Sequence, residues 1–144
     1  MKDSNLYFID TNIFLRILVK EDKKTFKECF EFVKKVREGK IKAFTSSLVL
    51  IEVGLVLGKT YKFSKKQVTD ALKGILNLKE LKIVDKYHPY LAVSIYEKFN
   101  VKFVDAFIAS SFLVDKKKLG SVIVSYDRDF DKIGVKRKEP KDFL

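Results

Sequence analysis

Short apolar runs alternate with longer segments of helical periodicity along the chain. Four compact apolar runs have the pattern of buried strands: residues 6–9, 41–44, 81–84 and 121–125. Between them, apolar side chains recur at helical intervals, which predicts helices from about residue 12 onward and at 23–38, 48–59, 64–76, 89–99 and 104–117. A short helical turn at 128–132 and an edge strand near Val135 complete the prediction.

This alternation is typical of an α/β domain with three layers, in which helices cover both faces of a central, mostly parallel sheet of four to five strands. The chain has 144 residues, of which 47% are hydrophobic, and this is enough for one domain over residues 1–144 with its own core. Sheets of this kind place their chemistry at the carboxyl ends of the strands. Polar residues that directly follow a predicted strand are therefore the first candidates for function.

Several classes of protein are excluded by composition. No apolar stretch approaches the ~20 residues of a membrane span, and the run before Asp10 holds only four apolar residues, too few for a signal peptide. We therefore expect a cytoplasmic protein with no membrane partner. The single cysteine, Cys29, excludes an internal disulfide and a cysteine metal cluster, and the single histidine, His88, argues against histidine-based nucleophilic catalysis.

The net charge of +11, from 30 Lys and Arg against 19 Asp and Glu, predicts a polyanionic partner. Nucleic acid is the first candidate and an anionic membrane surface the second, while a simply solvated lysine-rich surface is the alternative. Two basic clusters are candidate contacts to a nucleic-acid backbone, and equally a solvated helix end and tail: Lys116, Lys117 and Lys118, and Lys136, Arg137 and Lys138.

Two acidic residues follow predicted strands directly. Asp10 comes after the apolar run 6–9, and Asp127 lies just beyond the run 121–125. In a parallel sheet both would lie at the same edge. Each also has a simpler interpretation as a helix N-cap or turn residue, and taken alone neither is decisive.

Two further acidic residues interrupt apolar helices. Glu52 is the only charge in the ten residues 48–57, and Asp105 lies within the apolar segment 103–109. A buried carboxylate is costly unless it is paired, protonated or bound to a metal. The alternatives are a solvent-exposed position for Glu52 and a first-turn acid, stabilised by the helix dipole, for Asp105.

One arrangement accounts for all four acids, namely a carboxylate cluster at the edge of the sheet. Such carboxylates repel one another unless some are protonated or a cation neutralises them. Carboxylates without histidine or thiolate select hard ions, here Mg²⁺ or Mn²⁺. A site of this kind cleaves phosphodiesters by activating water, which leaves a 5′-phosphate and a 3′-hydroxyl.

In four motifs, the chain resembles the PIN-domain ribonuclease family, and in particular its VapC-type toxins from toxin–antitoxin pairs. The motifs are Phe8-Ile9-Asp10-Thr11-Asn12, the helix glutamate Glu52, Asp105-Ala106-Phe107-Ile108-Ala109, and Ser125-Tyr126-Asp127-Arg128-Asp129-Phe130. None is specific alone, but their order and the chain length match the family over essentially the whole sequence. Asp129 is an extra acid, and we prefer Asp127 because its three-residue step to Phe130 fits the closing motif.

The resemblance implies a function and a set of partners. It implies a PIN-like metal-dependent endoribonuclease in which Asp10, Glu52, Asp105 and Asp127 are both the metal ligands and the catalytic residues, with Asn12 and Ser125 as supporting polar groups. The cofactor it implies is Mg²⁺ or Mn²⁺. It also implies an RNA substrate, a small antitoxin protein that inhibits the enzyme, and a homodimer.

Two alternative functions share some of these residues. A haloacid-dehalogenase-like phosphatase also begins with a strand-end aspartate, but it needs a second aspartate two positions later, where this chain has Asn12. A non-catalytic PIN-like module that binds nucleic acid or a partner should lack one of the four acids, and this chain retains them all. A third strand-end acid, Asp85, is interpreted as a cap.

Overall fold

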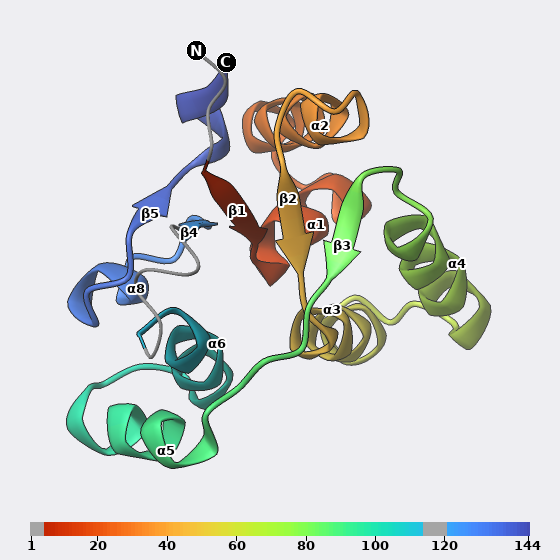
Figure 1. Ribbon diagram of the computed structural model, residues 1–144. Helices are drawn as coiled ribbons and strands as arrows, with labels where there is room; N and C mark the ends of the chain where they lie inside the picture. The colour runs from red at the N-terminus through yellow and green to blue at the C-terminus, as the bar shows by residue number, and fades with distance from the viewer. Residues whose placement is uncertain (1–4, 114–120) are drawn as a thin grey trace.

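The computed structural model describes residues 5–113 and 121–144, and it shows a parallel sheet flanked by helices (Figure 1). The sheet has five strands in the order β3-β2-β1-β4-β5, and every neighbouring pair is parallel. The strands are β1 (Leu6–Ile9), β2 (Ala43–Thr45), β3 (Leu81–Ile83), β4 (Ser121–Val124) and β5 (Arg137–Lys138). The predicted α/β class and the mostly parallel sheet are confirmed.

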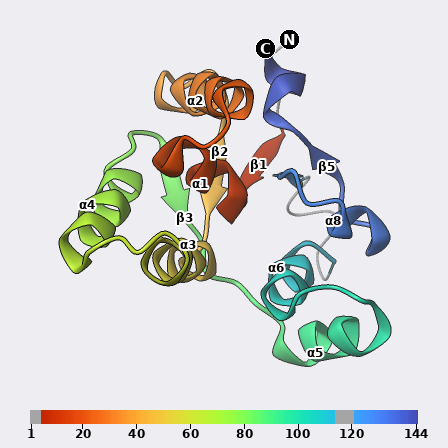
Figure 2. The ribbon, with the colours of Figure 1, turned by 180° about the vertical axis from the view of Figure 1, so that it is seen from behind.

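The α-helices in the described part of the chain lie between the strands in sequence, and a short 3₁₀ helix follows the last strand. They are α1 (Thr11–Val19), α2 (Lys23–Arg37), α3 (Ser47–Lys59), α4 (Lys65–Leu76), α5 (Pro89–Lys98), α6 (Phe103–Leu113), α8 (Asp129–Lys132) and the 3₁₀ helix η1 (Pro140–Phe143). Figure 2 shows from behind how they surround the sheet. No helix in this part of the chain is both long enough and apolar enough to cross a bilayer.

The central strand β1 shows which helices cover each face of the sheet. Successive side chains of a strand point to opposite faces, so Tyr7 and Phe8 face different layers. Phe8 packs edge-to-face against Phe112 of α6, with ring centroids 5.6 Å apart, whereas Tyr7 packs against Phe143 of η1 at 4.8 Å. Phe143 in turn contacts Phe32 of α2. The sheet is therefore buried between an α6 layer and an α2–η1 layer.

Two strands lie one or two residues beyond their predicted positions, while most other elements agree to within about a residue at each end. The strand expected at 41–44 is Ala43–Thr45, and the edge strand expected near Val135 is Arg137–Lys138. Val135 is buried and packs in the core instead. The edge strand pairs through its backbone, since Ile123 N donates to the carbonyl of Lys136. The two strand residues are polar, so the apolar pattern predicted the edge strand but placed it two residues too early.

Capping explains why several helices begin where they do. Ser64 and Gln67 form a reciprocal capping box at the start of α4. Asp85 also acts as a cap, but for α3 and not for the helix that follows it in sequence. Its carboxylate accepts hydrogen bonds from Ser47 N at 2.7 Å and from Ser47 Oγ at 2.6 Å. Asp85 thereby fixes the N-terminus of the helix that carries Glu52.

Candidate active site

Register brings the two strand-end segments together. β1 and β4 are neighbours in the sheet, and Ile9 is paired with Val124. Asp10 and Ser125 are the next residues of the two strands, and they lie side by side at the carboxyl edge of the sheet. Asp10 N donates to the carbonyl of Val124 at 3.1 Å, which extends the pairing by one residue.

Asp10 is almost fully buried, with 3% of its surface exposed, and hydrogen bonds surround its carboxylate. Its Oδ1 accepts from Thr11 N at 2.8 Å, so it is the N-cap of α1. Its Oδ2 accepts from Ser125 Oγ at 2.6 Å and from Asn12 Nδ2 at 3.2 Å. Asp10 therefore both caps α1 and lies in the acidic site.

Asn12 and Ser125 connect Asp10 to the segment that carries Asp127. Asn12 Nδ2 donates to Ser125 Oγ at 2.9 Å, and Asn12 Oδ1 accepts from Tyr126 N at 3.2 Å. Ser125 Oγ also accepts from Asp127 N at 3.0 Å. This network fixes the chain on both sides of Ser125 and so sets the position of Asp127.

Asp105, in the first turn of α6, carries an unsatisfied buried oxygen. Only 3% of the residue is exposed, and its Oδ2 has no hydrogen-bond partner within residues 5–113 and 121–144. Carboxylate oxygens of Asp105, Asp127 and Asp129 lie within 4.8 Å of one another. A buried polar atom without a partner is costly, so its presence beside two other carboxylates points to a ligand.

Glu52 reaches the same region from α3 and is half-buried. Its charge acts on both Asp10 and Asp105. The neighbouring residues Ile51 and Leu55 are 58% and 51% exposed. The helix therefore turns its charged residue partly inward and two apolar residues outward, which is the reverse of an ordinary surface helix.

Burial and mutual repulsion raise the pKa of two of these carboxyl groups. Burial raises the pKa of Asp10 to about 6, while the hydrogen bond from Ser125 acts in the opposite direction. Burial raises the pKa of Asp105 to about 9; the charge of Asp10, the close side-chain contact with Asp127, and the charges of Asp127 and Glu52 add to the shift. A group of acids held at such high pKa values favours protons or a cation.

These residues fit a divalent cation. The donors are carboxylate oxygens, which are the ligands that Mg²⁺ and Mn²⁺ prefer, and one buried oxygen of Asp105 is otherwise unsatisfied. Histidine and cysteine do not enter the cluster formed by the described residues. The donor set therefore suits a hard ion and not zinc held by nitrogen or sulfur.

Asp129, the extra acid of the closing motif, belongs to this cluster as well as Asp127. Asp129 N donates to Asp127 Oδ1 at 2.9 Å, and its own Oδ1 lies 3.0 Å from Lys132 Nζ. Asp127 remains in the cluster, so the structure adds Asp129 to the four acids predicted from the sequence. The spacing to Phe130 singled out one acid, whereas the tight turn before α8 brings both to the same place.

The basic residues proposed to contact nucleic acid differ in their surroundings. Arg137 is held inside the protein by Asp131, by Glu139 at 2.9 Å and by the carbonyl of Ser125 at 3.0 Å. Lys138 Nζ lies over the rings of Tyr7 and Phe143, and Lys136 is exposed. Lys116, Lys117 and Lys118 lie outside the described residues.

Comparison with known proteins agrees with this geometry. The chain matches the PIN domain family over residues 7–136. It is 29% identical over 135 residues to the VapC ribonuclease of Aquifex aeolicus (strain VF5), covering 92% of this chain and 95% of that protein.

Solved structures show the same fold. VapBC2 from Rickettsia felis, bound to a promoter DNA fragment, aligns with a TM-score of 0.63 at 20% identity, over 93% of this chain and 98% of that chain. VapC20 of Mycobacterium tuberculosis, described as a sarcin-ricin loop cleaving toxin, aligns with a TM-score of 0.57 at 22% identity, over 90% and 95% of the two chains. Since the family match spans nearly the whole sequence and the fold agrees, this chain belongs to the PIN domain family.

Proposed function

We propose that this protein is a VapC-like ribonuclease that hydrolyses RNA phosphodiester bonds with the help of Mg²⁺ or Mn²⁺. The observation that carries the proposal is the Asp105 carboxylate, which is buried, has an unsatisfied oxygen and lies within 4.8 Å of two further carboxylates. The 29% identity to a VapC ribonuclease supports the choice of RNA as the substrate.

The roles of the residues follow from their surroundings. Asp105 and Asp127, whose oxygens lie within 4.8 Å of each other and of Asp129, would hold the ion. Asp10 and Glu52 are not part of that group, but their charges act on Asp105, and they would complete the site. Asn12 and Ser125 keep Asp10 in place through their hydrogen bonds. The bound ion would supply Lewis-acid chemistry, lowering the pKa of water and stabilising negative charge on the phosphate. The Ser125 hydroxyl is engaged with Asp10, Asn12 and the Asp127 backbone, and no histidine or thiolate joins the acids among the described residues, so we take water as the attacking group.

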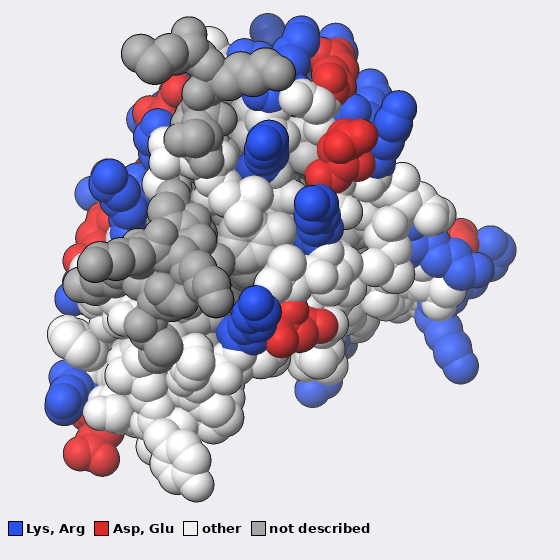
Figure 3. All heavy atoms as spheres, in the orientation of Figure 1, with Lys and Arg blue, Asp and Glu red and all other residues white. Residues whose placement is uncertain are grey.

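The surface charge supports a polyanionic substrate. The chain carries a net charge of +11, and Figure 3 shows Lys and Arg side chains spread over one face and not gathered into one patch. A dispersed positive field attracts a phosphate backbone without reading its sequence. We infer that overall charge brings RNA to the protein and that the acidic site determines where cleavage occurs.

RNA cleavage by the purified protein is the direct test of this function. With Mn²⁺ or Mg²⁺, single-stranded RNA should be cut to products with 5′-phosphate and 3′-hydroxyl ends, and a chelator should abolish the cleavage. Product ends are read by ligation and by phosphatase sensitivity. Cleavage that persists in chelator and leaves 2′,3′-cyclic phosphates would contradict the proposal.

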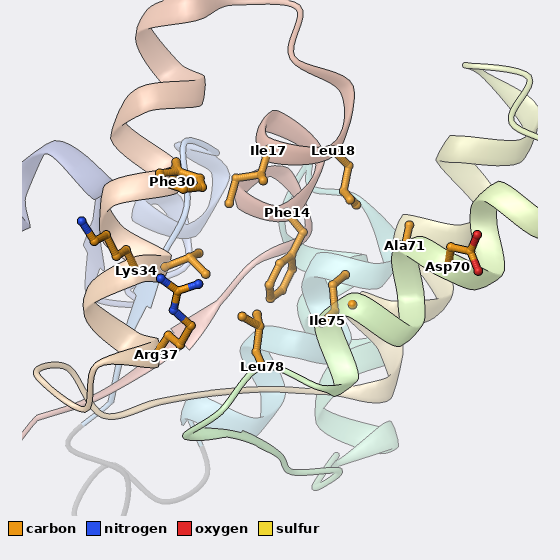
Figure 4. Close-up of a pocket in the computed structure, with 12 residues that line it drawn as sticks. Phe14, Ile17, Leu18, Phe30, Lys34, Arg37, Asp70, Ala71, Ile75 and Leu78 are labelled. Atoms are coloured by element: carbon orange, nitrogen blue, oxygen red, sulfur yellow. The ribbon is translucent and has the colours of Figure 1, made fainter.

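We propose that a small protein antitoxin binds this chain. A groove supports this; it lies on the face of α1 opposite to Asn12 and the acidic site. The groove has a volume of about 270 Å³, lies between α1, α2 and α4, and is walled by apolar side chains including Phe14, Phe30 and Ile75 (Figure 4). Lys34 and Arg37 line it from α2. Asp70 lines the groove from α4, so an amphipathic segment with an apolar face and with acidic residues on the α2 side, toward Lys34 and Arg37, would match both the lining and the charge.

We expect Phe30→Asp to weaken antitoxin binding by tenfold or more, because aromatic anchors in apolar pockets dominate such interfaces. Phe30 is 45% exposed, so the change should leave the fold intact. Phe99→Asp is the matched control, since Phe99 is 39% exposed and lies outside the groove. Binding is measured by co-purification and calorimetry with a candidate antitoxin, chosen from the small proteins encoded beside the gene. Equal binding by both variants would place the antitoxin elsewhere.

A homodimer is supported by exposed apolar residues on α5. Tyr90 is 93% exposed, and Val93 and Tyr96 are about half exposed. Apolar residues gathered in this way often mark a protein interface. Sedimentation equilibrium should therefore show a dimer for the wild-type protein and a monomer for Val93→Lys. A wild-type monomer at micromolar concentration would contradict this part of the proposal.

A further inference from the structure

A second hollow lies next to the acidic site and is distinct from the groove of Figure 4. It has a volume of about 190 Å³ and is lined by Asn12, Leu15, Arg16, Val19, Glu21 and Tyr61. The first four residues have helical spacing, so they form one stripe along α1. That stripe begins at Asn12, which hydrogen-bonds to Asp10 and Ser125. The hollow therefore leads directly away from the acids.

Arg16 brings into this hollow a positive charge that no carboxylate of the described residues pairs with. Within residues 5–113 and 121–144, Arg16 forms no salt bridge, although its charge acts on Asp22 at the start of α2. Its guanidinium lies 5.8 Å from the centre of the Tyr126 ring, between Ser125 and Asp127 in sequence. This contact holds the cation close to the acidic segment. Arg137, by contrast, is fully engaged by acids.

Tyr61 supplies an aromatic wall on the other side. It follows α3 and is half-buried, and its hydroxyl donates to Glu21 Oε2 at 3.1 Å. That bond fixes the ring against the start of the α1–α2 connection. Glu21 also makes this end of the hollow unfavourable for a phosphate, so a phosphate is expected at Arg16 and a base at Tyr61.

The size of the hollow indicates part of a larger ligand. Its volume of about 190 Å³ is below the ~300 Å³ at which pockets begin to hold whole small molecules. A cation, an aromatic ring and apolar walls in one recess are the groups that bind single-stranded RNA, in which bases stack on aromatic rings and phosphates pair with arginine.

We infer that this hollow is a subsite for the nucleotide next to the cleaved bond, with Arg16 binding its phosphate and Tyr61 stacking on its base. The inference rests on the proposed RNA substrate and adds to it the residues that orient the strand. Arg16 and Tyr61 are separated by 45 positions in sequence and come together only because α1 packs against α3.

Direct RNA binding tests the subsite. The Asp105→Asn protein in chelator is titrated with labelled single-stranded RNA of mixed sequence, so that the RNA stays intact. Adding Tyr61→Leu should weaken binding about tenfold, whereas Tyr61→Phe, which keeps the ring, should stay within about twofold. Arg16→Gln should reduce the slope of log affinity against log salt by about 0.7, the value for one phosphate contact on a single strand.

Lys98→Gln is the control, because it removes one exposed charge at the end of α5, away from the hollow. If Tyr61→Leu and Tyr61→Phe bind alike and Arg16→Gln behaves as Lys98→Gln does, the subsite is wrong, even where wild-type protein cleaves RNA. If the wild-type protein does not cleave RNA but these binding differences appear, the subsite stands and the nuclease function fails.

Discussion

Replacing Asp105 with asparagine is expected to lower RNA cleavage by at least about 10³-fold while making the metal-free protein more stable at pH 7. The loss follows because a bound metal contributes several kcal/mol of transition-state stabilisation, and asparagine cannot match a carboxylate as its ligand. The gain follows because the pKa of Asp105 is raised to about 9. Folding at pH 7 must then protonate a group that is ionised in the unfolded chain, and asparagine removes this cost.

The melting temperature in chelator measures the gain, which should be about 3 °C or more at pH 7. It should shrink as the pH falls and vanish below about pH 3, where Asp105 is protonated in both the folded and the unfolded state. Asp70→Asn is the matched control, since Asp70 is exposed on α4 and pairs with Lys66. A variant that melts lower than wild type and still cleaves RNA would show that Asp105 is a structural cap.

Without metal, the wild-type protein should lose stability as the pH rises from about 4 to about 9. The folded state holds the pKa of Asp10 at about 6 and that of Asp105 at about 9, whereas the unfolded value is about 3.9. Over this range the folded state binds more protons than the unfolded state, so the free energy of unfolding falls with pH. Exposed acids with lowered pKa, such as Asp22 and Asp85, act only below this range.

Mn²⁺ should reverse this trend, because the ion replaces the protons and binds the ionised carboxylates more tightly as the pH rises. Urea unfolding at pH 5, 7 and 9, in chelator and with saturating Mn²⁺, gives both curves. Asp105→Asn should flatten the chelator curve above pH 6. If stability in chelator were unchanged or higher at pH 9 than at pH 5, the acids would not form the coupled cluster described above.

The sequence alone determined the fold class and the identity of four candidate acids. Buried parallel strands appear as compact apolar runs, so the ends of β1 and β4 were readable and placed Asp10 and Asp127 at one edge. Glu52 and Asp105 could be identified because burying a carboxylate within an apolar helix is costly unless it is paired, protonated or bound to a cation. These signals are local, which is why periodicity and composition could detect them.

Other features depended on the tertiary structure. Asp129 joins the carboxylates because of a tight turn, Asp85 caps a helix that precedes it by almost forty residues, and Arg16 meets Tyr61 only through helix packing. The edge strand β5 pairs by backbone hydrogen bonds that leave no mark on side-chain periodicity. The distance between the groups in each of these contacts is set by how whole helices and strands pack. The pattern of residues along the sequence indicates which segments form helices or strands, but it does not show which of these elements pack against one another.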